Sequence, residues 1–262
     1  MSRPRFWVYL AGPFVIGSLV AHPEAYLTEW FWLLLLYFLV PANVLLYGVN
    51  DYFDADTDVR NEKKSGSREF LFSGESWVLW AWISSLVLGG LAAILLGVVG
   101  WWMALFLVLA VSYSAPPLRF KARPVLDSLS NVLYVVPGFL GYALFAGSLP
   151  AWWAVVASWA WVSAMHLYSA VPDIRADQAA GLRTTAVVLG ADASLMLCSV
   201  WWLLAVVAGS LSGWLVVASF LVYPVLALFL VCRSRRVVAR VYWWFPLLNA
   251  FMGFLLFVQA VA

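Results

Sequence analysis

Long uncharged stretches alternate with short charged segments along the whole chain. Six stretches contain no Asp, Glu, Lys or Arg; three have 18 to 22 residues and three have 40 to 45. A membrane-spanning helix needs roughly 20 predominantly apolar residues. Each short stretch therefore predicts one helix, and each long stretch predicts two. The six stretches are Phe6–Pro23, Trp30–Asn50, Ser76–Leu118, Ser128–Pro172, Ala193–Cys232 and Val241–Ala262.

Glycine, proline and serine mark the points at which the long stretches divide. These residue types favour turns, and they gather near Gly97–Gly100, Gly147–Pro150 and Gly209–Gly213. Because 65% of the residues are hydrophobic and only 11% are charged, no segment is left for a soluble domain. The sequence predicts an all-α membrane protein with nine transmembrane helices, in which residues 1–262 form a single integral-membrane domain.

The basic residues indicate how these helices cross the membrane. When nine helices are threaded through a bilayer, all 15 Lys and Arg residues fall on the same side. Cytoplasmic loops carry an excess of Lys and Arg, so the N-terminus is expected in the cytoplasm and the C-terminus outside. A wrong helix count would scatter the charges over both faces. The basic residues thus report topology and give no indication of nucleic-acid binding.

A cluster of acidic residues follows the second predicted helix. Residues 50–58 read NDYFDADTD and contain four of the 13 acidic residues. On a helix, four positions of this segment share one face and Asp56 points away. Clustered carboxylates repel one another, and ionisable groups are costly at the edge of a bilayer, so divalent cations are expected to compensate them. The four positions on the shared face are Asn50, Asp51, Asp54 and Asp58.

A second acidic pair follows the sixth predicted helix, on the same side of the membrane. Asp173 and Asp177 are four residues apart and are expected to stack on one helix face. Pro172 is expected to kink or reset the helix just before them. Two facing acidic clusters suit Mg²⁺, which binds a few carboxylates together with substrate phosphates. The predicted metal ligands are Asn50, Asp51, Asp54, Asp58, Asp173 and Asp177.

Basic residues lie close behind both acidic clusters. A phosphate held by Mg²⁺ also needs cationic partners for its remaining oxygens, and Arg can bind it through two hydrogen bonds. Lipid headgroups or topology are the alternative role for each of these residues. Lys64, Arg68 and Lys121 are favoured because they lie in loops that bracket the predicted mouth of the site. The full set of phosphate-binding candidates is Lys64, Arg68, Arg119, Lys121 and Arg175.

Three segments resemble the motifs of one enzyme family, the UbiA-type intramembrane prenyltransferases. NDYFDADTD matches the NDxxDxxxD motif, DIRAD matches DxxxD, and YSAPPLRFK resembles the family's Tyr-Ser…Pro…Lys segment after the fourth helix. The resemblance covers essentially the whole chain. The loop NEKKSGSREFLFSGE departs from the family pattern, because it keeps Arg68, Ser73 and Gly74 but lacks the usual proline.

The resemblance implies nine helices around a central cavity, capped on the cytoplasmic side of a prokaryotic plasma membrane. There, two Mg²⁺ ions would hold an isoprenyl diphosphate donor, with Asp54 and Asp173 as catalytic residues. Loss of diphosphate leaves an allylic cation, which must be shielded from water and stabilised by the faces of aromatic rings. An electron-rich carbon of a hydrophobic acceptor then attacks this cation.

A narrower resemblance, to one branch of the family, indicates the acceptor. SRPRFWVYLAGP and MHLYSAVPDIRADQAAGLRTTAVVLG are similar to the carotenoid branch of the family, the lycopene elongases, which add a dimethylallyl unit to lycopene. His166 lies seven residues before Asp173, so at about 100° per residue it is expected to point the same way, about 10 Å deeper in the membrane. There it could take the final proton or orient a water molecule. A hydrogen bond between helices is the alternative role for this histidine.

Two alternative functions remain open on the sequence. Other members of the family prenylate an aromatic quinone precursor or a glycerol-phosphate lipid; an aromatic acid would need a cation in the cavity, and no uncharged stretch supplies one. A cation-coupled membrane transporter is the alternative from a different class, since intramembrane acids also relay ions. Transport predicts ionisable residues through the depth of the membrane. Here the acidic residues gather at one end of the predicted helices, which favours an enzyme over a transporter.

Overall fold

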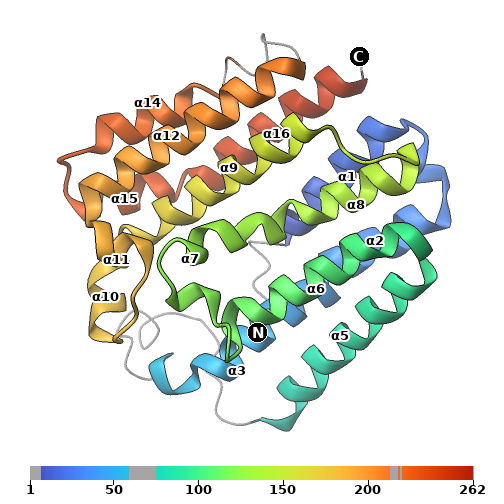
Figure 1. Cartoon of the computed structure of the whole chain (residues 1–262), viewed down its shortest axis with the longest axis horizontal. Helices are drawn as coiled ribbons and strands as arrows, with labels where there is room; N and C mark the ends of the chain where they lie inside the picture. The colour runs from blue at the N-terminus through green and yellow to red at the C-terminus, as the bar shows by residue number, and fades with distance from the viewer. Residues whose placement is uncertain (1–6, 59–74, 213–217, 219, 262) are drawn as a thin grey trace. The chain divides into compact units, whose positions relative to one another are not determined.

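The computed structural model describes residues 7–58, 75–212, 218 and 220–261, and the regular elements among them are all helices (Figure 1). By its internal contacts the chain divides into two compact units. Unit 1 comprises residues 1–120 and 133–149, and unit 2 comprises residues 121–132 and 150–262. The expectation of a single prenyltransferase domain therefore remains a prediction.

Unit 1 is built from helices that pack through close backbone contacts. α1 packs on α8 and α2, α3 packs on α5 and α6, and α6 packs on α8. At the crossing of α1 and α8, a Cβ added to Gly17 would collide with the backbone carbonyl of Gly138, so only glycine lets these helices approach so closely. The elements are α1 (Val8–Ala21), η2 (Ala25–Leu27), α2 (Glu29–Leu39), α3 (Pro41–Asp58), α5 (Ser76–Leu95), η3 (Gly97–Val99), α6 (Gly100–Ser114) and α8 (Val136–Ala146).

Unit 2 contains the second group of helices, joined by several short ones. α12 packs on both α9 and α14, and α11 packs on α10 and α12. Its elements are α7 (Leu126–Leu129), α9 (Trp152–Ala170), α10 (Ile174–Ala179), α11 (Thr185–Leu189), α12 (Ala191–Gly209), η6 (Ser210–Ser212), α14 (Val222–Leu230), α15 (Arg235–Tyr242) and α16 (Phe245–Val261). Two short 3₁₀ helices lie at the boundaries of the units, η4 (Phe120–Ala122) and η5 (Ser130–Tyr134).

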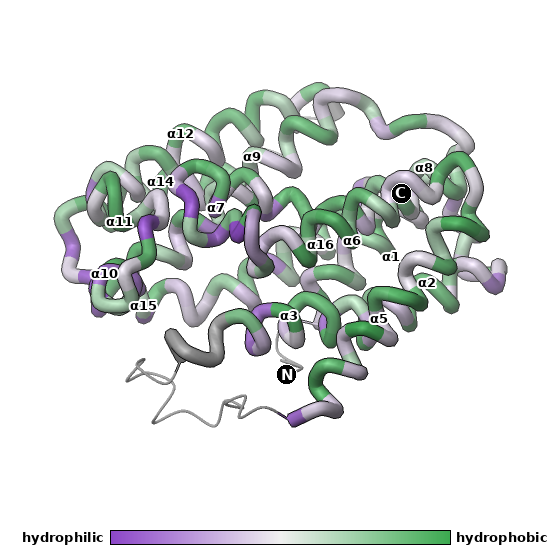
Figure 2. The backbone as a smooth tube through the Cα atoms, turned by 60° about the horizontal axis from the view of Figure 1, so that its bottom comes forward, coloured by the Kyte–Doolittle hydropathy of each residue, from purple (hydrophilic) through white to green (hydrophobic). Residues whose placement is uncertain are grey.

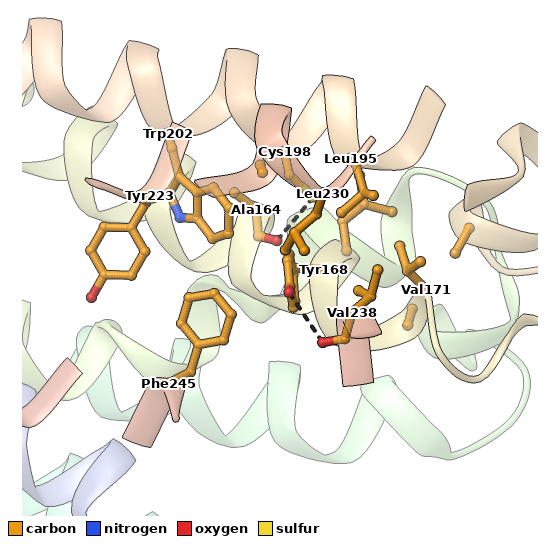
Figure 3. Packing of buried hydrophobic residues seen from close by; sticks show 14 of the residues in the cluster. Ala164, Tyr168, Val171, Leu195, Cys198, Trp202, Tyr223, Leu230, Val238 and Phe245 are labelled. Atoms are coloured by element: carbon orange, nitrogen blue, oxygen red, sulfur yellow. Dashed lines mark hydrogen bonds between the residues drawn. The ribbon is translucent and has the colours of Figure 1, made fainter. Parts of the chain in front are cut away.

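Buried aromatic rings form the core of unit 2 (Figure 3). The Trp202 ring lies 5.3 Å from Tyr223 and 6.0 Å from Phe245, measured between centroids. Tyr168 packs against Phe245 at 4.7 Å, and its hydroxyl donates a hydrogen bond to the backbone carbonyl of Val238 at 3.2 Å. These contacts place Tyr168 in the packing between α9, α15 and α16.

The predicted division points are confirmed where the structure describes them. Gly97 and Gly147 both have positive φ, +58° and +65°, which glycine adopts without strain, and each lies between two helices. The third division coincides with η6 and the end of α12. Local turn chemistry was therefore sufficient to locate these breaks.

Fewer than nine of the described helices qualify as membrane spans. By length and composition five are long and apolar enough to cross a bilayer within the described ranges, or six if the bent pair α15–α16 counts as one. α1 is apolar but shorter, and α14 has nine residues. The exposed face of α5 carries large apolar side chains, because Trp80 and Ile94 are 64% and 76% exposed. Hydrophobic residues also dominate the long helices (Figure 2). Nine spans and the orientation of the termini remain predictions.

Candidate active site

The first acidic motif lies on the C-terminal part of α3. This helix begins at Pro41, where a proline is tolerated because the first turn needs no backbone donor. It continues through Asp58, so the prediction that residues 50–58 are helical is confirmed. Asn50 is half-buried and Asp51 is 1% exposed. The side chains of Asp54 and Asp58 lie outside the described part of the structure.

A hydrogen bond joins this motif to the YSAPPLRFK segment. The Asn50 Nδ2 donates to the Ser114 Oγ at 3.2 Å, and Ser114 is fully buried at the end of α6. Arg119 follows in a tight turn, with φ of +40° and its N–H bonded to the carbonyl of Ala115 at 2.9 Å. Two segments that matched the family separately are thus in direct contact within unit 1.

The second acidic motif begins where α9 ends. The N–H of Asp173 bonds to the Ala170 carbonyl at 3.0 Å, a turn contact that interrupts the regular helical ladder. α10 then starts at Ile174, and the N–H of Asp177 bonds to the Asp173 carbonyl at 2.9 Å. Asp173 and Asp177 are therefore one helical turn apart and both are half-buried. The predicted reset of the helix at Pro172 is confirmed.

This break removes the basis for the expected direction of His166. The projection that aligned His166 with Asp173 assumed a continuous helix, and that assumption is wrong because α9 ends at Ala170. His166 itself lies on α9. Its role in catalysis stays a prediction.

Asp127 and two threonines are residues that the sequence reading missed. Asp127 lies on α7 with 0% exposure, and its carboxylate accepts hydrogen bonds from the backbone and the hydroxyl of Thr185. Thr184, the N-cap of α11, donates from its hydroxyl to Asp177 Oδ2 at 3.3 Å. Asp127 immediately precedes an uncharged stretch, which could have marked it as a buried acid at the edge of the membrane.

The basic candidates fall into three groups. Arg119 and Lys121 are half-buried, each in its own unit, whereas Arg175 is exposed on α10. Lys64 and Arg68 lie outside the described residues. Within unit 2, hydrophilic residues gather around α10 and α15 (Figure 2).

The side chains of both motifs fit a hard cation by their donor chemistry. Asn50, Asp51, Asp173 and Asp177 offer amide and carboxylate oxygens, the ligands that Mg²⁺ prefers. Among the described side chains there is no group of three or more His, Cys, Asp or Glu close enough to share an ion. The two motifs belong to different units, so a site shared by them remains a prediction.

The structure thus defines a helical membrane protein whose acidic motifs lie at helix ends. The sequence profile of the UbiA prenyltransferase family matches residues 10–259, so the chain belongs to this family and is a membrane prenyltransferase. It is 46% identical over 266 residues to a lycopene elongase/hydratase from Haloferax volcanii, covering 100% of this chain and 87% of that protein. A lycopene elongase/hydratase from Halobacterium salinarum is 44% identical over 257 residues, covering 97% and 92%. The resemblance to the carotenoid branch is confirmed.

The fold is also similar to that of solved structures. A UbiA homologue from Archaeoglobus fulgidus, bound to GPP and Mg²⁺, aligns with a TM-score of 0.71 and 21% identity over 98% of this chain and 97% of that one. A structure of a UbiA homologue from the same organism, bound to DMAPP and Mg²⁺, aligns with a TM-score of 0.67 and 20% identity over 98% and 97%. At this identity the likeness shows the fold alone.

Proposed function

We propose that this protein transfers a dimethylallyl group from its diphosphate to lycopene, in the synthesis of C45 and C50 carotenoids. The identity of 46% over the whole chain to a protein named lycopene elongase/hydratase carries this proposal. Binding of DMAPP by a UbiA homologue of the same fold supports the five-carbon donor. The membrane would be the plasma membrane of a prokaryote, with the active site facing the cytoplasm.

The acidic motifs would hold Mg²⁺. The proposed ligands are oxygen donors, as the chemistry of the ion requires. When bound, two Mg²⁺ ions would neutralise the diphosphate and make it a better leaving group. Asp54 and Asp173 are the ligands expected to matter most for turnover. The proposed set is Asn50, Asp51, Asp54 and Asp58 from one motif, and Asp173 and Asp177 from the other.

The basic residues would bind the remaining diphosphate oxygens. Arg119 is already fixed by its turn at the end of α6, close in sequence to Ser114, which contacts Asn50. Lys64, Arg68, Lys121 and Arg175 complete the proposed set. Cationic groups that face the bridging oxygen stabilise the negative charge that develops when the carbon–oxygen bond breaks.

The apolar environment suits the second half of the reaction. Loss of diphosphate leaves an allylic cation, and a terminal double bond of lycopene attacks it to form the new carbon–carbon bond. The resulting tertiary cation is resolved by loss of a proton or by addition of water, and His166 is the proposed base or water-orienting group. No Lys or Arg lies within the uncharged stretches, as expected for a hydrocarbon acceptor.

The test combines the purified protein in detergent with lycopene, dimethylallyl diphosphate and MgCl₂, with and without EDTA. A product heavier by one or two five-carbon units, with or without water, is expected only when Mg²⁺ is present. Mass spectrometry of the extracted carotenoids measures it. Turnover only with a phenolic or glycerol-phosphate acceptor would contradict the choice of lycopene and retain the prenyltransferase chemistry. If the protein reconstituted into vesicles took up cations and showed no turnover, both the choice of lycopene and the prenyltransferase chemistry would be contradicted.

A further inference from the structure

Two consecutive threonines at the start of α11 link the second acidic motif to Asp127. The Thr184 hydroxyl donates to Asp177 Oδ2 at 3.3 Å and accepts from the N–H of Val187 at the same distance. The N–H of Thr185 donates to Asp127 Oδ2 at 2.7 Å, and the Thr185 hydroxyl donates to the other carboxylate oxygen. A continuous path of covalent and hydrogen bonds therefore runs from Asp127 to Asp177.

Asp127 is held firmly at its end of this path. Its Oδ1 also accepts from the N–H of Ser128 at 2.9 Å, and its backbone carbonyl accepts from Asn131 Nδ2 at 2.5 Å. The Thr185 hydroxyl in turn accepts from the N–H of Val125 at 2.7 Å. A buried carboxylate is stable only when hydrogen bonds replace its water shell. Asp127 meets that condition through bonds that join the α7 segment to the start of α11.

The side chains of Thr184 and Thr185 are both buried. Thr184 is 6% exposed and Thr185 is 4% exposed. α10 and α11 lie side by side in unit 2 (Figure 1), and the N–H of Leu182 bonds to the Asp177 carbonyl at 2.9 Å. The turn between the two helices is therefore bonded to Asp177 through both Leu182 and Thr184. A displacement of α11 would move the Thr184 hydroxyl that contacts Asp177.

We infer that Asp127 and Thr184 are positioning residues for the second acidic motif. Asp127 fixes the start of α11, and Thr184 orients the carboxylate of Asp177 by donating a hydrogen bond to Oδ2. The inference rests on the proposed function, in which Asp177 is a metal ligand. Partners that orient a ligand typically change metal affinity by about 10- to 100-fold.

The experiment measures metal binding without turnover. The melting temperature of the full chain in detergent is recorded while MgCl₂ is titrated at a fixed concentration of inorganic pyrophosphate, which gives a midpoint for Mg²⁺. Thr184→Val keeps the shape of the side chain and removes its hydroxyl, so we expect the midpoint to rise by about 10- to 100-fold. Thr184→Ser restores the hydroxyl and should keep the midpoint close to that of the wild type.

A matched control separates positioning from helix capping. Thr28 caps α2 in the same way: its Oγ1 accepts from the N–H of Phe31 at 3.3 Å and donates to the Ala25 carbonyl at 2.7 Å. Thr28→Val therefore removes a comparable cap that bonds neither acidic motif. It should lower the metal-free melting temperature about as much as Thr184→Val does, and leave the Mg²⁺ midpoint unchanged.

Two further variants separate the inference from the proposed function. Asp127→Asn should raise the midpoint as Thr184→Val does, because its amide nitrogen cannot accept from Thr185. A midpoint that shifts in Asp177→Asn but stays unchanged in Thr184→Val would overturn the positioning role and retain the metal site. An unchanged midpoint in Asp177→Asn would overturn the metal site, and with it the inference.

Discussion

The Nδ2 of Asn50 donates a hydrogen bond to the Oγ of Ser114 at 3.2 Å, although 64 positions separate the two residues in the chain. This bond ties the first acidic motif on α3 to the end of α6, directly before the turn that holds Arg119. A proposed metal ligand and a proposed diphosphate ligand are thereby attached to the same point of unit 1.

Ser114→Ala should weaken donor binding, because Asn50 loses the partner that fixes its amide. We expect the KM for dimethylallyl diphosphate to rise several-fold and the free energy of unfolding to fall by about 1 kcal/mol. Steady-state kinetics and thermal unfolding measure the two effects. Ser85→Ala is the matched control, since the hydroxyl of this buried serine bonds to Ala81 on its own helix. An equal rise in KM in both variants would contradict the specific role.

Asp54→Asn and Asp173→Asn should each abolish turnover and leave the protein folded. Losing the charge of a proposed metal ligand would remove stabilisation of the departing diphosphate, so we expect at least about a 100-fold loss of kcat. Asp56→Asn is the control, because Asp56 lies in the same motif but is predicted to point away from the shared face. Carotenoid product formation and melting temperature are the measurements. Near-normal activity in both ligand variants would exclude the proposed site.

His166→Ala should change the product distribution more than the binding of diphosphate. If His166 takes the final proton or orients water, the ratio of the product formed by water addition to the product formed by proton loss will shift, while the KM for the donor stays near the wild-type value. Chromatography with mass detection measures that ratio. His22→Ala is the control, as it replaces the chain's other histidine, which bonds to Glu24 in an exposed turn. Unchanged products at an unchanged rate would remove His166 from the mechanism.

Gly17→Ala should destabilise unit 1, because the added methyl group would collide with the backbone carbonyl of Gly138. Forcing α1 and α8 apart is expected to cost about 1–3 kcal/mol, as overpacking does elsewhere. Gly90→Ala is the matched control, since a Cβ there meets open space on α5. Thermal unfolding in detergent compares the two variants, and equal melting temperatures would show that α1 and α8 can separate at no cost.

Local sequence signals predicted the helical class and the acidic motifs. Uncharged length identified membrane-compatible helices, and glycines with positive φ at positions 97 and 147 occupy predicted breaks. The spacing of NDYFDADTD predicted a helix that the structure confirms. Each of these signals depends on residues within a few turns of one another, which is why the sequence was sufficient.

The same local reasoning failed where a helix breaks or a partner is distant. The projection of His166 onto the face of Asp173 ignored the end of α9 at Ala170, even though Pro172 predicted a reset. Asp127 was overlooked because an isolated acid beside a basic loop looks like an exposed polar end. Its partner Thr185 lies 58 positions away, and no pattern in the sequence connects the two.

The sequence by itself determined the all-helical membrane class, the helical acidic motifs and the presence of oxygen-donor side chains of the kind that suits Mg²⁺. Hydrophobic length, turn residues and side-chain chemistry are local properties, which can be read without knowing how the helices pack. Only the tertiary structure decided that Ser114 holds Asn50, that Asp127 is buried against Thr185, and that Thr184 reaches Asp177. Such contacts depend on how helices and turns pack, because a directional hydrogen bond forms only when packing brings donor and acceptor within about 3 Å.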